Sequence, residues 1–220
     1  MRRLIGLLLS VLLVAQLGGC VTDVNDDSTA RVRVLHVSPD APNLDVLFDG
    51  VRVLSNVPYS ASSAYLVFPT GTHRITSNVA GTATTLIDIS QNLANAAAYT
   101  IIAANFAASI QGLTVTDQTV APPAGQAAIR AIHMAPDAGP VDVLLNGRVA
   151  FANMLFGANS GYLNLVAGTY DVKVNVAGTS TTLIETTLTA NATVNYSVVA
   201  TGSARTAATN PLALKVLTDG

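Results

Sequence analysis

The sequence of 220 residues has no tryptophan, one cysteine and few charged side chains. Only 5% of the residues are aromatic, which disfavours the aromatic platforms of a carbohydrate-binding face. Only 11% are charged and the formal net charge is −2, so no basic surface is available for a phosphate backbone. We therefore expect no nucleic-acid partner. Half of the residues are hydrophobic, which is typical of a folded globular chain.

Catalytic motifs are equally scarce. Glu185 is the only glutamate, and no pair of carboxylates points to glycoside hydrolysis. Residues 157–161 (GANSG) only approach the G-x-S-x-G pattern of a nucleophile elbow. No glycine-rich phosphate loop follows a predicted strand and opens a helix. We therefore expect a protein that is not an enzyme and that carries no cofactor.

The single cysteine, Cys20, follows a short apolar segment at the N-terminus. Arg2 and Arg3 form a positive region, and the apolar run 4–15 is shorter than the stretch of about 20 residues that spans a membrane. Residues 17–20 (LGGC) resemble the lipobox of bacterial lipoproteins, in which the cysteine is acylated after the signal is cleaved. The alternative is a buried free cysteine after an ordinary signal peptide. We expect residues 1–20 to be a lipoprotein signal peptide ending at a lipidated Cys20.

A lipid at Cys20 would attach the protein to a membrane, because several acyl chains on one residue give stable anchoring. Val21 follows the cysteine, and the absence of aspartate there resembles the sorting pattern that favours the outer membrane, although Asp23 lies close by. Whether the protein faces the periplasm or the exterior stays open. Residues 21–30 are polar and acidic, which predicts a flexible tether.

The rest of the chain is a tandem duplication. Residues 33–103 align with residues 130–200 at a constant offset of 97, and about 27 of the 71 aligned pairs are identical. Two units of roughly 90 residues match the common size of a domain. We expect domains at 31–118 and 128–220, joined by a proline- and glycine-containing linker at 119–127.

Hydrophobic residues alternate with a period of two in both units, which predicts strands. Asp49-Gly50 and Asn146-Gly147 lie between apolar runs and predict type I′ hairpin turns. Seven or eight short strands separated by turn residues are typical of a β-sandwich. The expected fold is all-β, with two tandem immunoglobulin-like antiparallel β-sandwich domains.

Tyr99 and Tyr196 each open a late strand after a polar loop. They resemble the tyrosine corner of immunoglobulin-like sandwiches, in which the hydroxyl bonds to upstream backbone. The alternative is a tyrosine that only packs at a sheet edge. His73 is replaced by Tyr170 in the second unit, so we expect His73 to be a surface residue.

Both units also keep one histidine, one proline and two aspartates in the pattern H-x-x-P-D-A-x-x-x-D-V. The residues are His36, Pro39, Asp40 and Asp45 in the first unit, and His133, Pro136, Asp137 and Asp142 in the second. This opening resembles bacterial domains grouped as domain of unknown function 4397. The second unit departs from the family pattern at Ala135 and Gly139. The resemblance implies an extracytoplasmic β-sandwich and no established activity.

Three roles are open for these repeated loops. Proline and aspartate favour a turn, and the histidine could donate to a carbonyl or carboxylate that holds the loop against the sandwich. Imidazole and carboxylates could instead bind a divalent metal, but their spacing matches neither an EF-hand nor a zinc signature, so we assign no metal. A hydrolase assembled between the domains is the third hypothesis.

The leading functional hypothesis is a non-enzymatic, lipid-anchored protein of the bacterial cell envelope, with the two sandwiches as a structural or adhesive binding module. Its partners would be the membrane, through the N-terminal lipid, and an envelope or surface protein or polymer. The alternative is a metal- or ligand-binding protein that uses the repeated histidine and aspartate loops.

Overall fold

The structure is a computed structural model that describes residues 28–206 and 208–220. The expected signal peptide, Cys20 and most of the expected tether therefore lie outside the described residues. Within the described part, the chain is almost entirely β-strand, and no helix is long and apolar enough to span a membrane. One short 3-10 helix, η1 (Ala107–Ser109), is present.

The described strands fall into two sets of eight, which we call repeat one and repeat two. Repeat one contains β1 (Thr29–His36), β2 (Leu44–Phe48), β3 (Val51–Val57), β4 (Leu66–Pro69), β5 (Gly71–Val79), β6 (Thr85–Leu93), β7 (Ala98–Ala104) and β8 (Gln111–Asp117). Repeat two contains β9 (Gln126–His133), β10 (Val141–Leu145), β11 (Arg148–Met154), β12 (Leu163–Val166), β13 (Gly168–Val176), β14 (Thr182–Ala190), β15 (Asn195–Thr201) and β16 (Ala213–Asp219).

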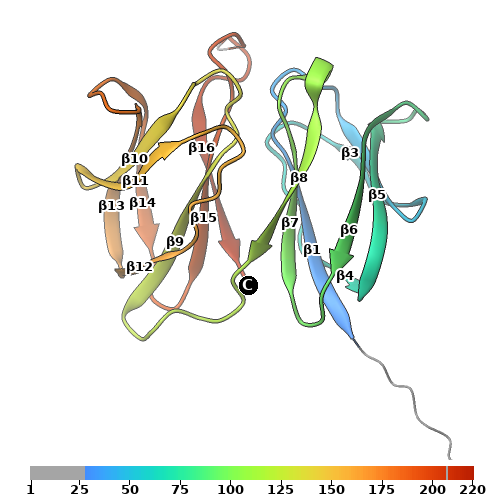
Figure 1. The fold of residues 1–220 in the computed structure, drawn as a ribbon, viewed down its shortest axis with the longest axis horizontal. Coiled ribbons are helices and arrows are strands. Elements are labelled where there is room, and N and C mark those ends of the chain that lie inside the picture. Colours follow the sequence, from blue (N-terminus) through green and yellow to red (C-terminus); the bar gives the residue numbers. More distant parts are fainter. Residues whose placement is uncertain (1–27, 207) are drawn as a thin grey trace, which may run out of the picture.

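Each repeat is a sandwich of two four-stranded sheets (Figure 1). In repeat one the strand orders are β4-β1-β7-β8 and β3-β2-β5-β6, and in repeat two they are β12-β9-β15-β16 and β11-β10-β13-β14. Neighbouring strands are antiparallel except for β1 with β7 and β9 with β15, which are parallel. The prediction of two all-β sandwich domains is confirmed, with a parallel pair in each that local patterning could not indicate.

The two hairpin turns have the predicted geometry. Asp49 and Gly50 both have positive φ, at 49° and 81°, and Asn146 and Gly147 have φ of 51° and 75°. Positive φ at both central residues is the requirement of a type I′ turn, whose twist matches that of the flanking strands. The turns set the registers of β2 with β3 and of β10 with β11.

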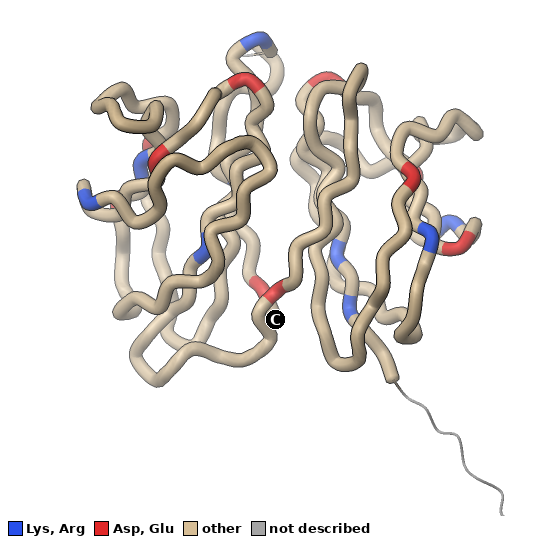
Figure 2. Tube along the Cα trace, in the orientation of Figure 1, with Lys and Arg blue, Asp and Glu red and all other residues tan. Residues whose placement is uncertain are grey.

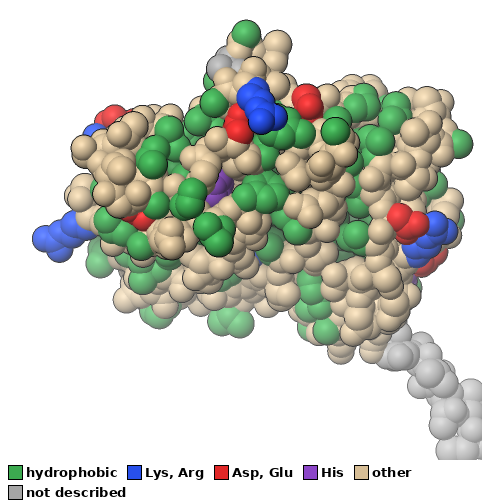
Figure 3. Space-filling view, turned by 45° about the horizontal axis from the view of Figure 1, so that its top comes forward, with side chains coloured by type: hydrophobic (Ala, Val, Ile, Leu, Met, Phe, Trp, Pro, Cys, Tyr) green, Lys and Arg blue, Asp and Glu red, His purple; other side chains and the backbone are tan. Residues whose placement is uncertain are grey.

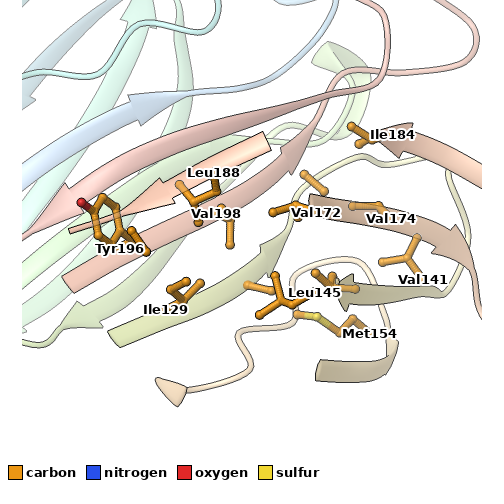
Figure 4. Close-up of a cluster of buried hydrophobic side chains, with 14 of the residues drawn as sticks. Ile129, Val141, Leu145, Met154, Val172, Val174, Ile184, Leu188, Tyr196 and Val198 are labelled. Atoms are coloured by element: carbon orange, nitrogen blue, oxygen red, sulfur yellow. The ribbon is translucent and has the colours of Figure 1, made fainter. Parts of the chain in front are cut away.

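Each sandwich has its own apolar core between its two sheets. In repeat two, Figure 4 shows side chains from both sheets meeting there, including Ile129 and Val198 from one sheet and Leu145 and Val172 from the other. All four are buried, as are their neighbours in the cluster. The buried side chains recur at every second position, which is how a two-layer sandwich reads in sequence.

A tyrosine corner closes each sandwich, as the sequence predicts. The hydroxyl of Tyr99 accepts a hydrogen bond of 3.1 Å from the backbone N–H of Ala94, and the hydroxyl of Tyr196 accepts one of 3.1 Å from that of Asn191. Both rings are buried. Each bond fixes the loop that precedes the strand carrying the tyrosine.

The two repeats pack against each other through the sheets that contain β1 and β9 (Figure 1). We call this interface the seam. Along β1, Val32 and Val34 point into the core of repeat one, whereas Leu35 points into the seam. The apolar part of the seam joins residues of repeat one with residues of repeat two: Leu35, Val37, Ile102, Ala104 and Val115 with Ile132, Met134, Val199 and Leu217. The molecule is therefore a stack of four sheets.

Candidate functional site

The repeated loops follow β1 and β9, and each begins with a buried histidine. His36 is 0% exposed and its Nε2 lies 3.2 Å from the carbonyl oxygen of Pro42. His133 is 1% exposed and its Nε2 lies 2.8 Å from the carbonyl oxygen of Gly139. Because a carbonyl only accepts, Nε2 carries the proton in both residues. Each histidine thus ties the start of its loop to the end of the same loop.

Burial also sets the charge state of these histidines. Desolvation lowers the pKa of both His36 and His133, which favours the neutral imidazole. The edges of the two rings contact the aromatic rings of Tyr59 and Phe156, at centroid distances of 6.4 and 6.5 Å. The histidines therefore lie inside the fold, away from solvent.

The first aspartate of each loop bonds to a neighbouring loop. Asp40 accepts a hydrogen bond of 2.7 Å from the backbone N–H of Ala107, at the start of η1. Asp137 accepts from the hydroxyl of Ser203 at 2.8 Å and from the backbone N–H of Arg205 at 3.0 Å. Pro39 and Pro136 form the turns that place these aspartates.

The second aspartate lies at the start of the following strand and bonds to different segments of the chain. Asp45 accepts backbone N–H bonds from Asn56 at 2.8 Å and from Gly81 at 3.0 Å. Asp142 accepts the equivalent bonds from Asn153 at 2.7 Å and from Gly178 at 2.9 Å. These backbone bonds lower the pKa of each aspartate and join three neighbouring strands of one sheet.

The four residues of each loop therefore do not converge on one point. The histidine bonds within the loop, the first aspartate bonds to the β7–β8 or β15–β16 loop, and the second bonds within the other sheet. Among the described residues there is no group of three or more histidine, cysteine, aspartate or glutamate side chains that could hold a metal ion. The geometry supports the loop-holding role over the metal-binding hypothesis.

A second cluster, which the sequence analysis did not single out, lies in the seam. Arg33 of repeat one donates to Asp219 of repeat two at 2.6 Å and to the carbonyl oxygen of Thr218 at 2.8 Å. Arg130 of repeat two donates to Asp117 of repeat one and to the carbonyl oxygen of Thr116. Each repeat therefore supplies an arginine to the aspartate of the other.

Hydroxyl groups complete this reciprocal cluster. Thr100 donates to Asp117 at 2.7 Å, and Ser197 donates to Asp219 at 2.5 Å. The same two hydroxyls accept from the arginine of their own repeat, at 2.8 Å for Arg33 and 2.7 Å for Arg130. Both arginines and both aspartates are less than 8% exposed. Buried charges of this kind are tolerated only when they are paired and hydrogen-bonded.

Two tyrosines cover the cluster. The hydroxyl of Tyr65 donates to Asp117 at 2.7 Å, and that of Tyr162 donates to Asp219 at 2.8 Å. Their rings lie 4.8 Å from the guanidinium groups of Arg33 and Arg130. Desolvation raises the pKa of both hydroxyls, and the adjacent aspartate adds to the shift. Figure 2 shows basic positions on either side of the seam and acidic positions between them.

A sequence signal for this cluster was present. The chain has few charges, yet both repeats keep an arginine in the first strand and an aspartate at the end of the last strand. A charged pair retained inside two apolar strands indicates a buried ion pair. Its location between the repeats could not be foreseen, because the strand pattern does not reveal which sheets face each other.

His73 lies at the surface, as expected, but its side chain is partly covered and makes two hydrogen bonds. Its side chain is 13% exposed, with Nδ1 2.7 Å from the carboxylate of Asp49 and Nε2 2.9 Å from the carbonyl oxygen of Pro69. The bond to Asp49 raises the pKa of His73. Tyr170, its counterpart, donates to the equivalent carbonyl of Val166 at 2.5 Å, so both residues bond to the same backbone position of their repeat.

The repeated loops meet at one end of the molecule. The strands β1 and β9 begin at the lower end in Figure 1, and the loops that follow them lie at the upper end, which we call the far end. There Asn210 donates to the carbonyl oxygen of Pro39 at 2.7 Å, and the guanidinium of Arg205 lies 5.0 Å from the ring of Phe106. Figure 3 turns this end forward and shows hydrophobic side chains scattered over it with few charged ones.

Comparison with known proteins gives a family. A family model described as Domain of unknown function (DUF4397) matches residues 30–143 and 132–219. No curated protein matches the chain. Among solved structures, a leucine-rich repeat protein from Bacteroides thetaiotaomicron VPI-5482 aligns at 12% identity with a TM-score of 0.21. That alignment covers 77% of this chain and 25% of the other, so the chain spans about a quarter of that protein's length.

The first match covers repeat one and extends into β10 of repeat two, and the second covers most of repeat two, so together they cover nearly all of the described residues. The chain therefore belongs to the family Domain of unknown function (DUF4397) and contains two copies of its domain.

Proposed function

We propose that the protein is a non-enzymatic, lipid-anchored component of the bacterial cell envelope, directed to the outer membrane, whose paired sandwiches present the far end to a surface protein or polymer. The observation that carries the proposal is that the start of β1 and the repeated loops lie at opposite ends of the molecule. The described chain enters repeat one through β1 at the lower end, and the repeated loops of both domains lie at the opposite end (Figure 1). A lipid on Cys20 would leave those loops facing away from the membrane.

The seam adds a mechanical argument. A spacer that holds a binding surface away from a membrane works best when its domains do not swivel. Here the reciprocal ion pairs and the apolar contacts of the seam join the two sandwiches directly. The contacts of Asn210 with Pro39 and of Arg205 with Phe106 also join loops from the two repeats into one surface.

A binding role also accords with the state of the loop residues. The repeated histidines are buried, which favours their neutral form, and Asp40 and Asp137 are engaged by backbone N–H groups. None of these groups is poised to exchange a proton with a substrate. The loops are therefore better suited to present a fixed shape than to perform acid–base chemistry.

The anchor is tested by replacing its acceptor thiol. In cells fed a fatty-acid analogue, the parent protein should be labelled and processed, whereas Cys20→Ser should stay unlabelled and accumulate as precursor. A Ser10→Ala variant, altered within the same leader, serves as the control and should behave as the parent. Normal labelling of Cys20→Ser would refute the anchor.

The presenting surface is tested by site-specific crosslinking in intact envelopes. A photoreactive side chain at Ala108, which is exposed in η1 at the far end, should capture a discrete partner. The same group at Asn95, which is exposed in the β6–β7 loop at the opposite end, is the matched control. Equal capture of the partner from both positions would contradict the proposal that the far end is the binding surface.

A further inference from the structure

A groove of about 560 Å³ opens on the side of repeat two, between the edge strands β11 and β12. This volume lies within the range of about 300–1,000 Å³ found for small-molecule sites. Leu145 and Leu165 line it, together with the partly exposed side chains of Val149 and Leu163. The groove is lined mainly by apolar side chains and is accessible from solvent.

Repeat one fills the corresponding space with two aromatic rings. Phe48 and Phe68, the counterparts of Leu145 and Leu165, stack at a centroid distance of 3.9 Å with their planes 8° apart. Two leucines occupy less volume than two phenylalanines, so the same backbone leaves an open groove in repeat two. The duplication thus provides an internal reference in which two stacked aromatic rings occupy the positions of the two leucines.

The groove also has an unpaired positive charge. In repeat one, Arg52 of β3 reaches Asp45 at 3.2 Å. In repeat two the arginine stands one position earlier, as Arg148, and successive strand residues point to opposite faces. Arg148 lines the groove, and no carboxylate among the described residues pairs with it.

Two uncharged polar side chains of the groove make hydrogen bonds within repeat two. The hydroxyl of Tyr170 donates to the carbonyl oxygen of Val166, and the side-chain oxygen of Asn146 accepts from the backbone N–H of Asp171. Arg148 is the one charged group that lines this groove. A complementary ligand would have an apolar body and one anionic group, since guanidinium pairs with a carboxylate through two parallel hydrogen bonds.

We propose that this groove binds a small amphiphile with an aliphatic chain and a single carboxylate. The chain lies along Leu145, Leu163 and Leu165, and the carboxylate pairs with Arg148. This site lies on the side of repeat two, apart from the far end. It does not depend on the lipid anchor or on the partner proposed above.

The test uses residues 21–220, which include every described residue, with monomeric decanoate as the probe and 1-decanol as its uncharged counterpart. Isothermal titration should show that decanoate binds more tightly than decanol. Arg148→Val installs the residue of repeat one, Val51, and should weaken decanoate binding by about tenfold while leaving decanol binding unchanged.

A second variant closes the groove. Leu145→Phe/Leu165→Phe installs the aromatic pair that repeat one already packs, so it should fold with an unchanged or higher melting temperature and lose both probes. Decanoate binding that survives in this variant would overturn the proposal, as would equal binding to the parent and Arg148→Val. Failure of the parent to bind monomeric decanoate would also overturn it, and so would binding only to decanoate-containing vesicles.

Discussion

At the scale of single residues, the positions that both repeats share are the ones that hold loops and domains together. The histidine, proline and two aspartates could be identified from the sequence because the duplication repeats them. Their separate partners could not be foreseen, since Pro42, Ala107 and Asn56 come from three different segments. A repeated pattern shows which residue types are kept, but residues bind a common ligand only when the fold brings their side chains together.

The buried histidines make stability depend on pH. Since folding lowers the pKa of His36 and His133, the unfolded chain binds protons below about pH 6.5 that the folded chain does not. The free energy of unfolding should therefore fall as the pH drops from 7.5 to 5.5, by at most about 1.4 kcal/mol per pH unit for each histidine. Urea unfolding at these pH values measures it.

His73 changes the free energy of unfolding with pH in the opposite direction, so its contribution must be removed from that measurement. Folding raises the pKa of His73, so its contribution is present below about pH 6.5 and is lost as the pH rises through the folded value. His73→Tyr, which copies Tyr170, is the suitable background. In that background, the double variant His36→Gln/His133→Gln should show a smaller change in the free energy of unfolding between pH 7.5 and 5.5. An unchanged dependence on pH would contradict the assignment of this effect to His36 and His133.

At the scale of elements, turns and strand ends were the most predictable features. The dipeptides Asp49-Gly50 and Asn146-Gly147 predicted their hairpins because only certain residues accept positive φ. The parallel pairing of β1 with β7 could not be predicted, because it joins residues 67 positions apart, from Arg31 with Ala98 onward, with no local signal. The same holds for β9 with β15.

The tyrosine corners give a prediction at this scale. Removing the hydroxyl in Tyr99→Phe deletes one hydrogen bond to backbone while keeping the buried ring, so stability should fall by about 0.5–1.5 kcal/mol. Tyr196→Phe should cost a similar amount, because its bond has the same length. Chemical denaturation of both variants measures this, and Tyr170→Phe on the exposed edge is a useful comparison. No loss in either corner variant would mean that these tyrosines only pack.

At the scale of the whole molecule, the constant offset of 97 predicted two domains of one fold. It could not predict that they stack through a buried seam, because residues such as Leu35 and Ile132 look like ordinary core positions in the sequence. The repeated strands β1 and β9 are buried on both faces, one toward their own core and one toward the other repeat. Two modules in tandem thus become one four-layer body.

The reciprocal cluster is tested by breaking one of its pairs. Arg130→Met leaves Asp117 short of a partner in a buried site, which should cost about 3–5 kcal/mol. Adding Asp117→Asn removes the uncompensated charge, so the double variant should be more stable than the sum of the single losses implies. Equilibrium unfolding of the four members of this cycle measures the coupling. Strictly additive losses would show that the pair contributes no direct interaction.

Differential scanning calorimetry of residues 21–220 tests most directly whether the two repeats behave as one body. If the seam joins them, the protein unfolds in one transition whose calorimetric enthalpy equals its van't Hoff enthalpy. Two independent sandwiches of equal stability would instead give a calorimetric enthalpy about twice the van't Hoff value, and unequal ones would give two peaks. Either of those results would contradict a single rigid unit held by Arg33, Arg130, Asp117 and Asp219.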